Sequence, residues 1–232
     1  MKIRIKFAKY GIMKYIGHLD MMRYFQKALR RAEIDVRYSE GFSPHQIMSF
    51  ASPLGVGIES TGEYMDIEVL SMDSTEEMKQ ALNDVMVEGV EILSVNILPD
   101  NAKNAMASVA AASYRLQMKE TFFSAADLNQ KLQEFYAQET IPYTKETKKS
   151  VIELDLKQGI YELKADQEGA IYMMVNASSS GNIKPAMVMD KFCQFTGVEI
   201  SERAYQITRL ETYTDSVEKN GERRFIPLES IH

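Results

Sequence analysis

Hydrophobic and polar residues alternate strictly at the start of the chain, in the segment KIRIKFAK over residues 2–9. Ile3, Ile5 and Phe7 fall on one side of an extended backbone and the basic residues on the other, which predicts a half-buried strand. Residues 18–33 contain neither glycine nor proline, and their apolar residues recur at helical spacing. The apolar face of this predicted helix consists of Leu19, Met22, Phe25 and Leu29.

The rest of the first half continues with alternating strand and helix patterns. In order, it predicts a strand over 47–58, a turn at 60–62, a strand over 63–70, a helix over 74–88 and a strand over 90–98. Ser74, followed three residues later by Glu77, is the capping-box pattern of a helix start. The first half therefore has the predicted order β-α-β-β-α-β.

The second half repeats this order. It predicts strands over 113–119, 151–156, 160–164, 170–177 and 204–213, and helices over 124–138 and 185–196. Pro185 stands at a favourable first helical position, and Gly197 is a typical helix stop. We expect an α+β fold of two tandem ferredoxin-like domains, each an antiparallel sheet backed by helices. The expected boundaries are domain 1–99, an Ala-rich connector 100–112, domain 113–214 and a tail 215–232.

Ferredoxin-like sheets commonly bind RNA by stacking bases on sheet aromatics. The chain shows neither a matching aromatic pair on a central strand nor an RNP1-type pattern. A standard RNA-recognition motif is therefore not expected, and fold class alone does not assign a function.

Composition restricts the protein class. Hydrophobic residues make up 45% of the chain and charged residues 26%, as in an ordinary soluble globular protein. No apolar run approaches the roughly 18 residues of a membrane span, and residues 1–9 lack the apolar core of a signal peptide. Cys193 is the single cysteine, so the chain alone cannot form an intramolecular disulfide or an all-cysteine metal site. We expect a cytoplasmic protein without a membrane partner.

The net charge of −6 is unevenly distributed. Residues 1–45 hold ten Lys and Arg against four Asp and Glu, and the remaining residues hold 17 against 29. Such segregation suggests a surface for an anionic partner, although a solvated basic helix gives the same count.

The basic residues of the predicted helix follow one face. Arg23, Lys27 and Arg30 are spaced by four and three residues, with Arg31 at the edge of the stripe. Guanidinium and ammonium groups at this spacing suit phosphates or carboxylates. The alternative is a solvated face on which Asp20 pairs with Arg23. His18, at the helix start, fits either a structural role or a proton-transfer role.

The segment YSEGFSPHQIMSF, residues 38–50, is a loop rich in aromatic residues between the helix and the next strand. Gly41 and Pro44 restrict its backbone, and His45 follows directly, in the kind of loop that often carries function. No HExxH motif or triad spacing accompanies the histidines. A metal site combining them with Asp20 or Glu63 is too weakly indicated to predict.

The segment from Gly17 to Val69 resembles the radical-SAM-associated protein family, a domain of unknown function. It reads GHLDMMRYFQKALRRAEIDVRYSEGFSPHQIMSFASPLGVGIESTGEYMDIEV. The family pattern is SHLD, R, RALRRA, YS-GF-PHP, G-ES and EY, and GNIKP and ITRLETY extend the likeness through the second half. Gly17 replaces the usual Ser, and Gln46 the usual Pro. The matching residues of the loop and the following strand are Ser39, Gly41, Phe42, Pro44, His45, Glu59 and Glu63.

The resemblance implies a radical SAM enzyme as a partner in trans, and neighbouring RNA-processing genes in the family imply RNA as a second partner. The CxxxCxxC cluster motif is missing, so no cofactor is expected on this chain, and a catalytic role is less expected than a binding role. The oligomeric state is not predicted.

Three functions follow from these patterns. The first is a non-catalytic accessory module that binds tRNA or rRNA through a basic groove and works with the radical SAM enzyme. The second is a metal-independent RNA endonuclease with His18 and His45 as the acid and base. The third is a protein-only adaptor. The groove requires residues 34–46 to run back along the helix, with Phe42 packed on the domain and His45 near Arg23.

Overall fold

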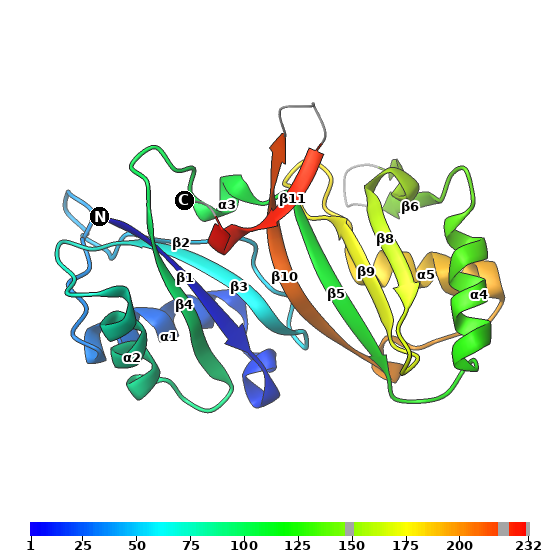
Figure 1. Ribbon diagram of the computed structural model, residues 1–232, viewed down its shortest axis with the longest axis horizontal. Coiled ribbons are helices and arrows are strands. Elements are labelled where there is room, and N and C mark those ends of the chain that lie inside the picture. The colour runs from blue at the N-terminus through cyan, green and yellow to red at the C-terminus, as the bar shows by residue number, and fades with distance from the viewer. Residues whose placement is uncertain (147–150, 218–222, 231–232) are drawn as a thin grey trace. The chain divides into compact units, whose positions relative to one another are not determined.

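The chain forms two compact units in the computed structural model, which describes residues 1–146, 151–217 and 223–230 (Figure 1). Unit 1 comprises Met1–Ala110 together with Arg209–His232, and unit 2 comprises Ala111–Thr208. The end of the chain therefore clusters with unit 1, including residues 209–214, which the sequence placed in the second domain. Within the predicted tail, residues 218–222 and 231–232 lie outside the described residues.

Unit 1 is a mixed α/β unit with antiparallel strands. Its first half contains β1 (Lys2–Lys9), η1 (Gly11–Tyr15), α1 (His18–Arg31), β2 (Met48–Phe50), β3 (Glu59–Glu68), α2 (Thr75–Val85) and β4 (Val90–Leu98). After β4 come α3 (Ala105–Ser108), the part of β10 (Tyr205–Val217) from Arg209 onward, β11 (Arg223–Pro227) and η4 (Leu228–Ser230). The sheet runs β4-β1-β3-β10, and β2 pairs with the C-terminal part of β3.

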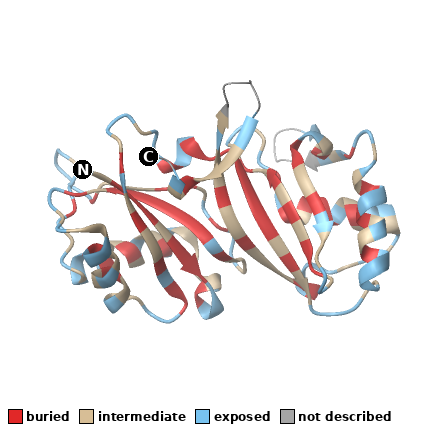
Figure 2. Cartoon of the chain, in the orientation of Figure 1, coloured by how far each residue is buried: buried red, intermediate tan, exposed pale blue. Residues whose placement is uncertain are grey.

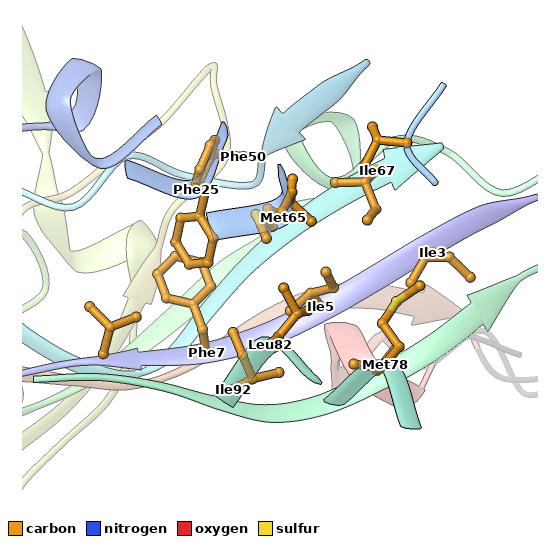
Figure 3. Packing of buried hydrophobic residues seen from close by; sticks show 14 of the residues in the cluster. Ile3, Ile5, Phe7, Phe25, Phe50, Met65, Ile67, Met78, Leu82 and Ile92 are labelled. Atoms are coloured by element: carbon orange, nitrogen blue, oxygen red, sulfur yellow. The ribbon is translucent and has the colours of Figure 1, made fainter. Parts of the chain in front are cut away.

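The core of unit 1 lies between this sheet and helices α1 and α2. Ile3, Ile5 and Phe7 point into it from β1, as the alternating pattern predicts (Figure 3). The buried residues of α1 are Met21, Phe25, Ala28 and Leu29. The prediction that Leu19 belongs to the apolar face was wrong, because Leu19 is 62% exposed. Burial follows positions 21, 25, 28 and 29, which share one helical face.

The strand predicted over 47–58 is much shorter. Only Met48–Phe50 forms β2, and residues 51–58 are a loop in which Gly57 adopts φ +86°. The turn predicted at 60–62 lies inside β3. A Cβ on Gly62 would lie 2.5 Å from the Cα of Glu211, so glycine here allows β10 to approach closely.

Unit 2 has the same mixed composition. Its elements are β5 (Ala111–Met118), α4 (Ala125–Tyr136), β6 (Pro142–Glu146), β7 (Val151–Asp155), η2 (Leu156–Gly159), β8 (Ile160–Ala165), β9 (Ile171–Asn176), α5 (Pro185–Thr196), η3 (Glu202–Ala204) and the first residues of β10. Strands β5, β9 and β8 are neighbours in the sheet, whereas β6 and β7 form a separate hairpin. Buried positions concentrate on the strands, and the helices keep exposed faces (Figure 2).

The predicted helix starts at Ser74 and Ser124 are confirmed by their caps, whereas α2 and α4 end two or three residues before the predicted ends. The hydroxyl of Ser74 accepts a hydrogen bond from the backbone N–H of Glu77, and that of Ser124 accepts one from Asp127. Helix α5 begins at Pro185 and ends at Gly197, which adopts the left-handed conformation at φ +70°. No helix in the described parts of the chain is both long and apolar enough to cross a membrane.

Candidate nucleic-acid interface on unit 1

The exposed face of α1 carries the predicted basic stripe. Leu19, Arg23, Lys27 and Arg30 lie within about 80° of one another around the helix axis, and all four are exposed. Arg23 forms an exposed ion pair with Asp20 at 3.1 Å. Lys27 and Arg30 form no ion pair with any described carboxylate, so they remain available to an anionic ligand.

Arg31, predicted at the edge of the stripe, has a structural contact. Its Nη2 donates a hydrogen bond to the backbone oxygen of Val85 at the end of α2, 3.1 Å away. The side chain is nevertheless exposed. Arg31 therefore connects α1 to α2 while its charge faces solvent.

Apolar and aromatic side chains gather at the N-terminal end of α1. We call Tyr10, Ile12, Tyr15, Leu19 and Val56 the exposed apolar cluster. Their exposed fractions are 41%, 79%, 65%, 62% and 63%, respectively. Exposed apolar groups that form a patch on a domain commonly mark an interaction site.

The loop carrying Val56 is held against η1. The N–H of Gly57 donates to the backbone oxygen of Lys14 at 2.9 Å, and the ammonium of Lys14 pairs with Glu59 at 3.0 Å. The same ammonium lies over the ring of Tyr15, 5.6 Å from its centroid. Glu59, a predicted site residue, therefore orders the exposed apolar cluster by fixing Lys14.

His18 packs on the core. Its ring makes an edge-on contact with the ring of Phe50, with 5.2 Å between centroids, and Phe50 in turn contacts Phe7 and Phe25. This half-buried position favours the structural role for His18.

The predicted site loop folds as a hairpin. Tyr38 and Gln46 form a β-bridge, and the N–H of Ser39 donates to the backbone oxygen of His45 at 2.8 Å. The Ser39 hydroxyl lies 2.9 Å from Nδ1 of His45 and also accepts the His45 backbone N–H. Gly41 makes the turn at φ +106°. We call residues 36–47 the site hairpin.

The expectation that Phe42 packs on the domain was wrong, because Phe42 is fully exposed near the tip of the site hairpin. Pro44 and His45 are exposed beside it. Short-range hydrogen bonds across the hairpin close it on itself, and no described hydrogen bond or ring contact joins its tip to the sheet or helices.

No contact among the described residues joins the parts of the predicted groove. The base of the site hairpin is held at the end of β3, where Val36 bridges to Val69 and Arg37 donates to Glu68. The hydrogen bonds of His45 are all made within the hairpin. Five residues, which span about 16 Å when extended, link His45 to Phe50, against which His18 packs. The described contacts therefore join His18 to Phe50 and His45 to its own hairpin, and none of them links the two histidines.

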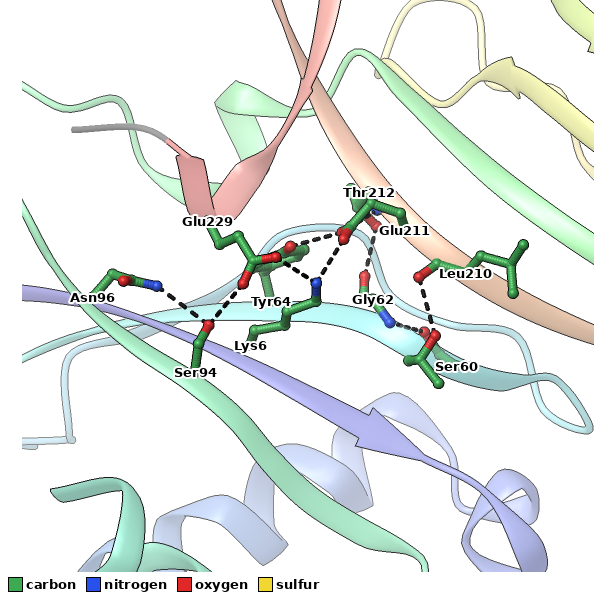
Figure 4. A network of polar contacts seen from close by, with 11 residues as sticks. Lys6, Ser60, Gly62, Tyr64, Ser94, Asn96, Leu210, Glu211, Thr212 and Glu229 are labelled. Atoms are coloured by element: carbon green, nitrogen blue, oxygen red, sulfur yellow. Dashed lines mark hydrogen bonds and ion pairs between the residues drawn. The ribbon is translucent and has the colours of Figure 1, made fainter. Parts of the chain in front are cut away.

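Much of the positive charge of residues 1–45 is neutralised inside unit 1. The guanidinium of Arg4 is fully buried and binds both carboxylate oxygens of Asp66 at 2.8 and 2.9 Å. The ammonium of Lys6 lies between Glu211 and Glu229 at 2.6 and 2.7 Å (Figure 4). The basic residues of this segment that pair with carboxylates are Arg4, Lys6, Lys14, Arg23 and Arg37. The count of charges thus overstates the basic surface.

The same network shifts the pKa values of its members. Burial lowers the pKa of Lys6, but the hydrogen bonds and charges of Glu211 and Glu229 outweigh it and raise the pKa above its usual value. Burial raises the pKa of Tyr64, whose hydroxyl donates to Glu211 at 2.7 Å (Figure 4). Burial lowers the pKa of Lys9, whose ammonium donates to the backbone oxygen of Ile16.

Glu63, the last predicted site residue, is buried. Its carboxylate accepts a hydrogen bond from the guanidinium of Arg209 at 2.9 Å. Over residues 1–146, 151–217 and 223–230, no group of three or more His, Cys, Asp and Glu side chains is placed to hold a metal ion. Glu63 therefore stabilises the fold.

The exposed apolar cluster was missed by sequence reasoning. A sequence signal for this cluster lies in the segment YGIMKYIGHL, residues 10–19. Its apolar residues follow neither a helical nor a strand repeat, so one buried face cannot hold them all. Only Met13 of η1 is buried, so the other apolar residues of that turn face solvent.

A family model matches residues 2–185, which is most of the chain. The chain belongs to this family, described as an uncharacterized protein conserved in bacteria (DUF2344). The family description does not mention radical SAM enzymes, so the match does not support the expected link to them. The matched residues include α1, the exposed apolar cluster and the site hairpin. No curated protein matches the chain.

Two solved structures show a distant likeness. A chain of the crystal structure of a Cbf5-Nop10-Gar1 complex aligns at 9% identity with a TM-score of 0.49, covering 90% of this chain and 48% of that one. This chain therefore spans about half the length of that relative. The first two RRM domains of yeast poly(U)-binding protein (Pub1) align at 9% identity with a TM-score of 0.22, covering 90% and 98%. At these TM-scores neither likeness carries an argument about function.

Proposed function

We propose that this member of the DUF2344 family is a non-catalytic module that binds single-stranded RNA on the α1 face of unit 1. The observation that carries the proposal is that exposed aromatic residues directly precede a helix whose exposed cations pair with no described carboxylate. Tyr10 and Tyr15 precede α1 and are exposed, while Lys27 and Arg30 lie on the exposed face of α1. Leu19 and Lys27 are about 12 Å apart along the axis.

This arrangement suits a single strand. Bases stack on exposed aromatic rings, and the backbone phosphates need cations a few ångströms further along. A double helix offers no unstacked base to such rings. The site hairpin carries two further exposed aromatic residues, Tyr38 and Phe42.

The test is fluorescence anisotropy with a labelled single-stranded RNA of mixed sequence, titrated from low to high salt. Binding is expected at low salt and weakens steeply as salt rises, because each neutralised phosphate releases counterions. The variant Lys27→Gln/Arg30→Gln is expected to make the slope of log affinity against log salt concentration less steep by about 1–2. Each lost phosphate contact accounts for about one unit or slightly less.

The matched control is Lys184→Gln/Lys191→Gln, which removes the same charge from unit 2. It is expected to bind like the wild type. Tyr15→Ala is expected to weaken binding about 5-fold or more through lost stacking, whereas Tyr15→Phe keeps the ring and the affinity. No binding at low salt, or equal losses in the charge variant and its control, rejects the proposal.

The fold proposal is that both units are ferredoxin-like. In unit 1 the elements follow β-α-β-β-α-β, and the strand neighbours β4-β1-β3-β2 support it. In unit 2 the neighbours β5-β9-β8 support it once the β6-β7 hairpin is treated as an insertion. Each sheet then carries its helices on one face.

A radical SAM enzyme acting in trans remains the proposed partner, on the strength of the resemblance in residues 17–69. Co-purification with and without nuclease separates this accessory role from a protein-only adaptor. A partner retained after nuclease treatment supports direct protein contact. Loss of the partner with the RNA supports joint binding on RNA. The endonuclease alternative needs His18 and His45 to act together, and no described contact favours that.

A further inference from the structure

Unit 2 contains a cleft that the proposed function does not use. It has a volume of about 720 Å³ and lies between α5 and the segment leading into β10. This volume is within the range of about 300–1,000 Å³ that small-molecule sites occupy. The residues that line it and matter here are Met189, Asp190, Cys193, Glu199, Glu202 and Tyr205.

The floor of the cleft is apolar. Met189 and Tyr205 are 2% and 5% exposed, and Val198 and Ile200 add further apolar surface. The rim is acidic, because Asp190, Glu199 and Glu202 are exposed there. Among the described residues that line the cleft, there is no Lys or Arg. None of the three carboxylates forms an ion pair with a described residue.

The hydroxyl of Tyr205 is the second indication of a ligand. Tyr205 is only 5% exposed, yet its hydroxyl makes no hydrogen bond to any described residue. Burial raises the pKa of Tyr205 to about 12, and the charges of Glu202, Cys193 and Asp190 add to the shift. Tyr205 lines the cleft together with these three residues, and its phenol stays protonated at neutral pH.

Cys193 does not provide an alternative chemistry. Burial raises the pKa of its thiol, and the nearby Asp190 carboxylate contributes in the same direction. A thiol with a raised pKa is a poor nucleophile near neutral pH. The cleft is therefore suited to binding.

We propose that this cleft binds an alkylammonium group carried on an apolar chain. The ammonium is held by the acidic rim and by the phenol oxygen of Tyr205 as an acceptor, while the methylene chain lies on Met189 and Ile200. An anionic ligand would meet three carboxylates and no cation. A free diamine and the lysine side chain of a peptide share this chemistry.

The probes are three six-carbon molecules that differ only in their ends, titrated calorimetrically into the full chain at low salt. 1,6-Diaminohexane is expected to bind, whereas hexane-1,6-diol and adipate are not. Carbon-13 methyl spectra of the methionines locate the binding, with the Met189 signal assigned through Met189→Leu. The Met189 signal is expected to shift with the diamine alone.

The variants test the residues in turn. Each of Asp190→Asn, Glu199→Gln and Glu202→Gln is expected to weaken diamine binding about twofold to fivefold, as for exposed ion pairs, and the triple variant more than any single one. Tyr205→Phe removes only the hydroxyl and is expected to weaken binding as well. The triple control Glu134→Gln/Glu139→Gln/Glu153→Gln removes three exposed carboxylates of the same unit away from the cleft and is expected to bind like the wild type.

A final titration distinguishes a free amine from the lysine side chain of a protein as the ligand. Tetralysine binding tighter than the diamine points to a protein's lysine side chain, and the reverse order points to a free amine; both support the proposal. It is overturned if no ammonium probe binds, if hexane-1,6-diol binds equally, or if the triple variant and its control bind alike. Thermal unfolding of each variant confirms that it is folded.

Discussion

Glu63 on β3 and Arg209 on β10 form a buried ion pair across 146 residues of sequence, with 2.9 Å between Oε1 and Nη1. The two side chains are only 7% and 6% exposed. Arg209 also donates to the backbone oxygen of Ser52 at 2.9 Å. Glu63, which matches the family pattern, thus helps to attach β10 to β3 within unit 1.

Glu63→Gln leaves the guanidinium of Arg209 buried without its counter-charge. We expect the free energy of unfolding of unit 1 to fall by about 3–5 kcal/mol, measured by urea denaturation. The double variant Glu63→Leu/Arg209→Met removes both charges and is expected to lose less than the two single replacements together. A loss below about 1 kcal/mol in the single variant contradicts the prediction, because that is the size of an exposed pair.

Gly62→Ala tests the close approach of β3 and β10. The added methyl group would lie 2.5 Å from the Cα of Glu211 and 2.8 Å from the backbone oxygen of Leu210, and neither backbone atom can move alone. We expect a loss of about 1–3 kcal/mol in thermal or urea unfolding. Gly17→Ser is the control, because no atom lies within 4 Å of its Cβ position and serine caps helices well. Equal losses in the two variants contradict the packing argument.

Gly41→Ala tests the site hairpin. Gly41 adopts φ +106°, and its Cβ position is open, so the cost of alanine comes from the backbone alone. We expect the free energy needed to open the hairpin to fall by about 1–3 kcal/mol. Hydrogen exchange at the Ser39 amide, which donates to His45, reports this opening. Unchanged exchange at Ser39, with unchanged global stability, shows that the turn tolerates a side chain.

Tyr64 makes stability depend on alkaline pH. Burial raises its pKa well above the usual range, with Glu211 adding to the shift, so the folded protein keeps a proton that the unfolded chain releases near about pH 10. The contribution of Tyr64 is therefore fully present below about pH 10 and is lost as pH rises further, by up to about 1.4 kcal/mol per pH unit.

Tyr64→Phe removes this titration. In urea unfolding between about pH 9 and about pH 11, the variant is expected to lose less stability than the wild type as pH rises. Tyr15→Phe is the matched control, because Tyr15 is 65% exposed, and it is expected to follow the wild type. Parallel pH profiles for Tyr64→Phe and the wild type contradict the prediction.

Several elements could be predicted from sequence because their signals are local. The alternation around Ile3, Ile5 and Phe7 defines β1, and Ser74, Ser124 and Gly197 mark helix ends through contacts three or four residues away. The exposed stripe of Arg23, Lys27 and Arg30 follows from helical geometry once α1 exists. These predictions needed no knowledge of distant contacts.

The candidate site was only partly predictable. The sequence indicates that the segment from His18 to Arg31 and the segment from Ser39 to His45 both matter, but not that hydrogen bonds within the hairpin keep His45 away from α1. It also does not show that Leu19 and Phe42 face solvent. Their exposure depends on which face of each element the remaining chain covers.

The sequence by itself therefore determined most of the order of strands and helices, the capping residues and the presence of a basic helix, but it did not predict β6 or β11. Only the tertiary structure decided which charges remain free. Arg4, Lys6 and Glu63 find partners in Asp66, Glu211, Glu229 and Arg209. These pairs join residues as many as 223 positions apart. Local spacing carries no information about such contacts, because burial in the folded chain, and not sequence distance, determines which opposite charges meet.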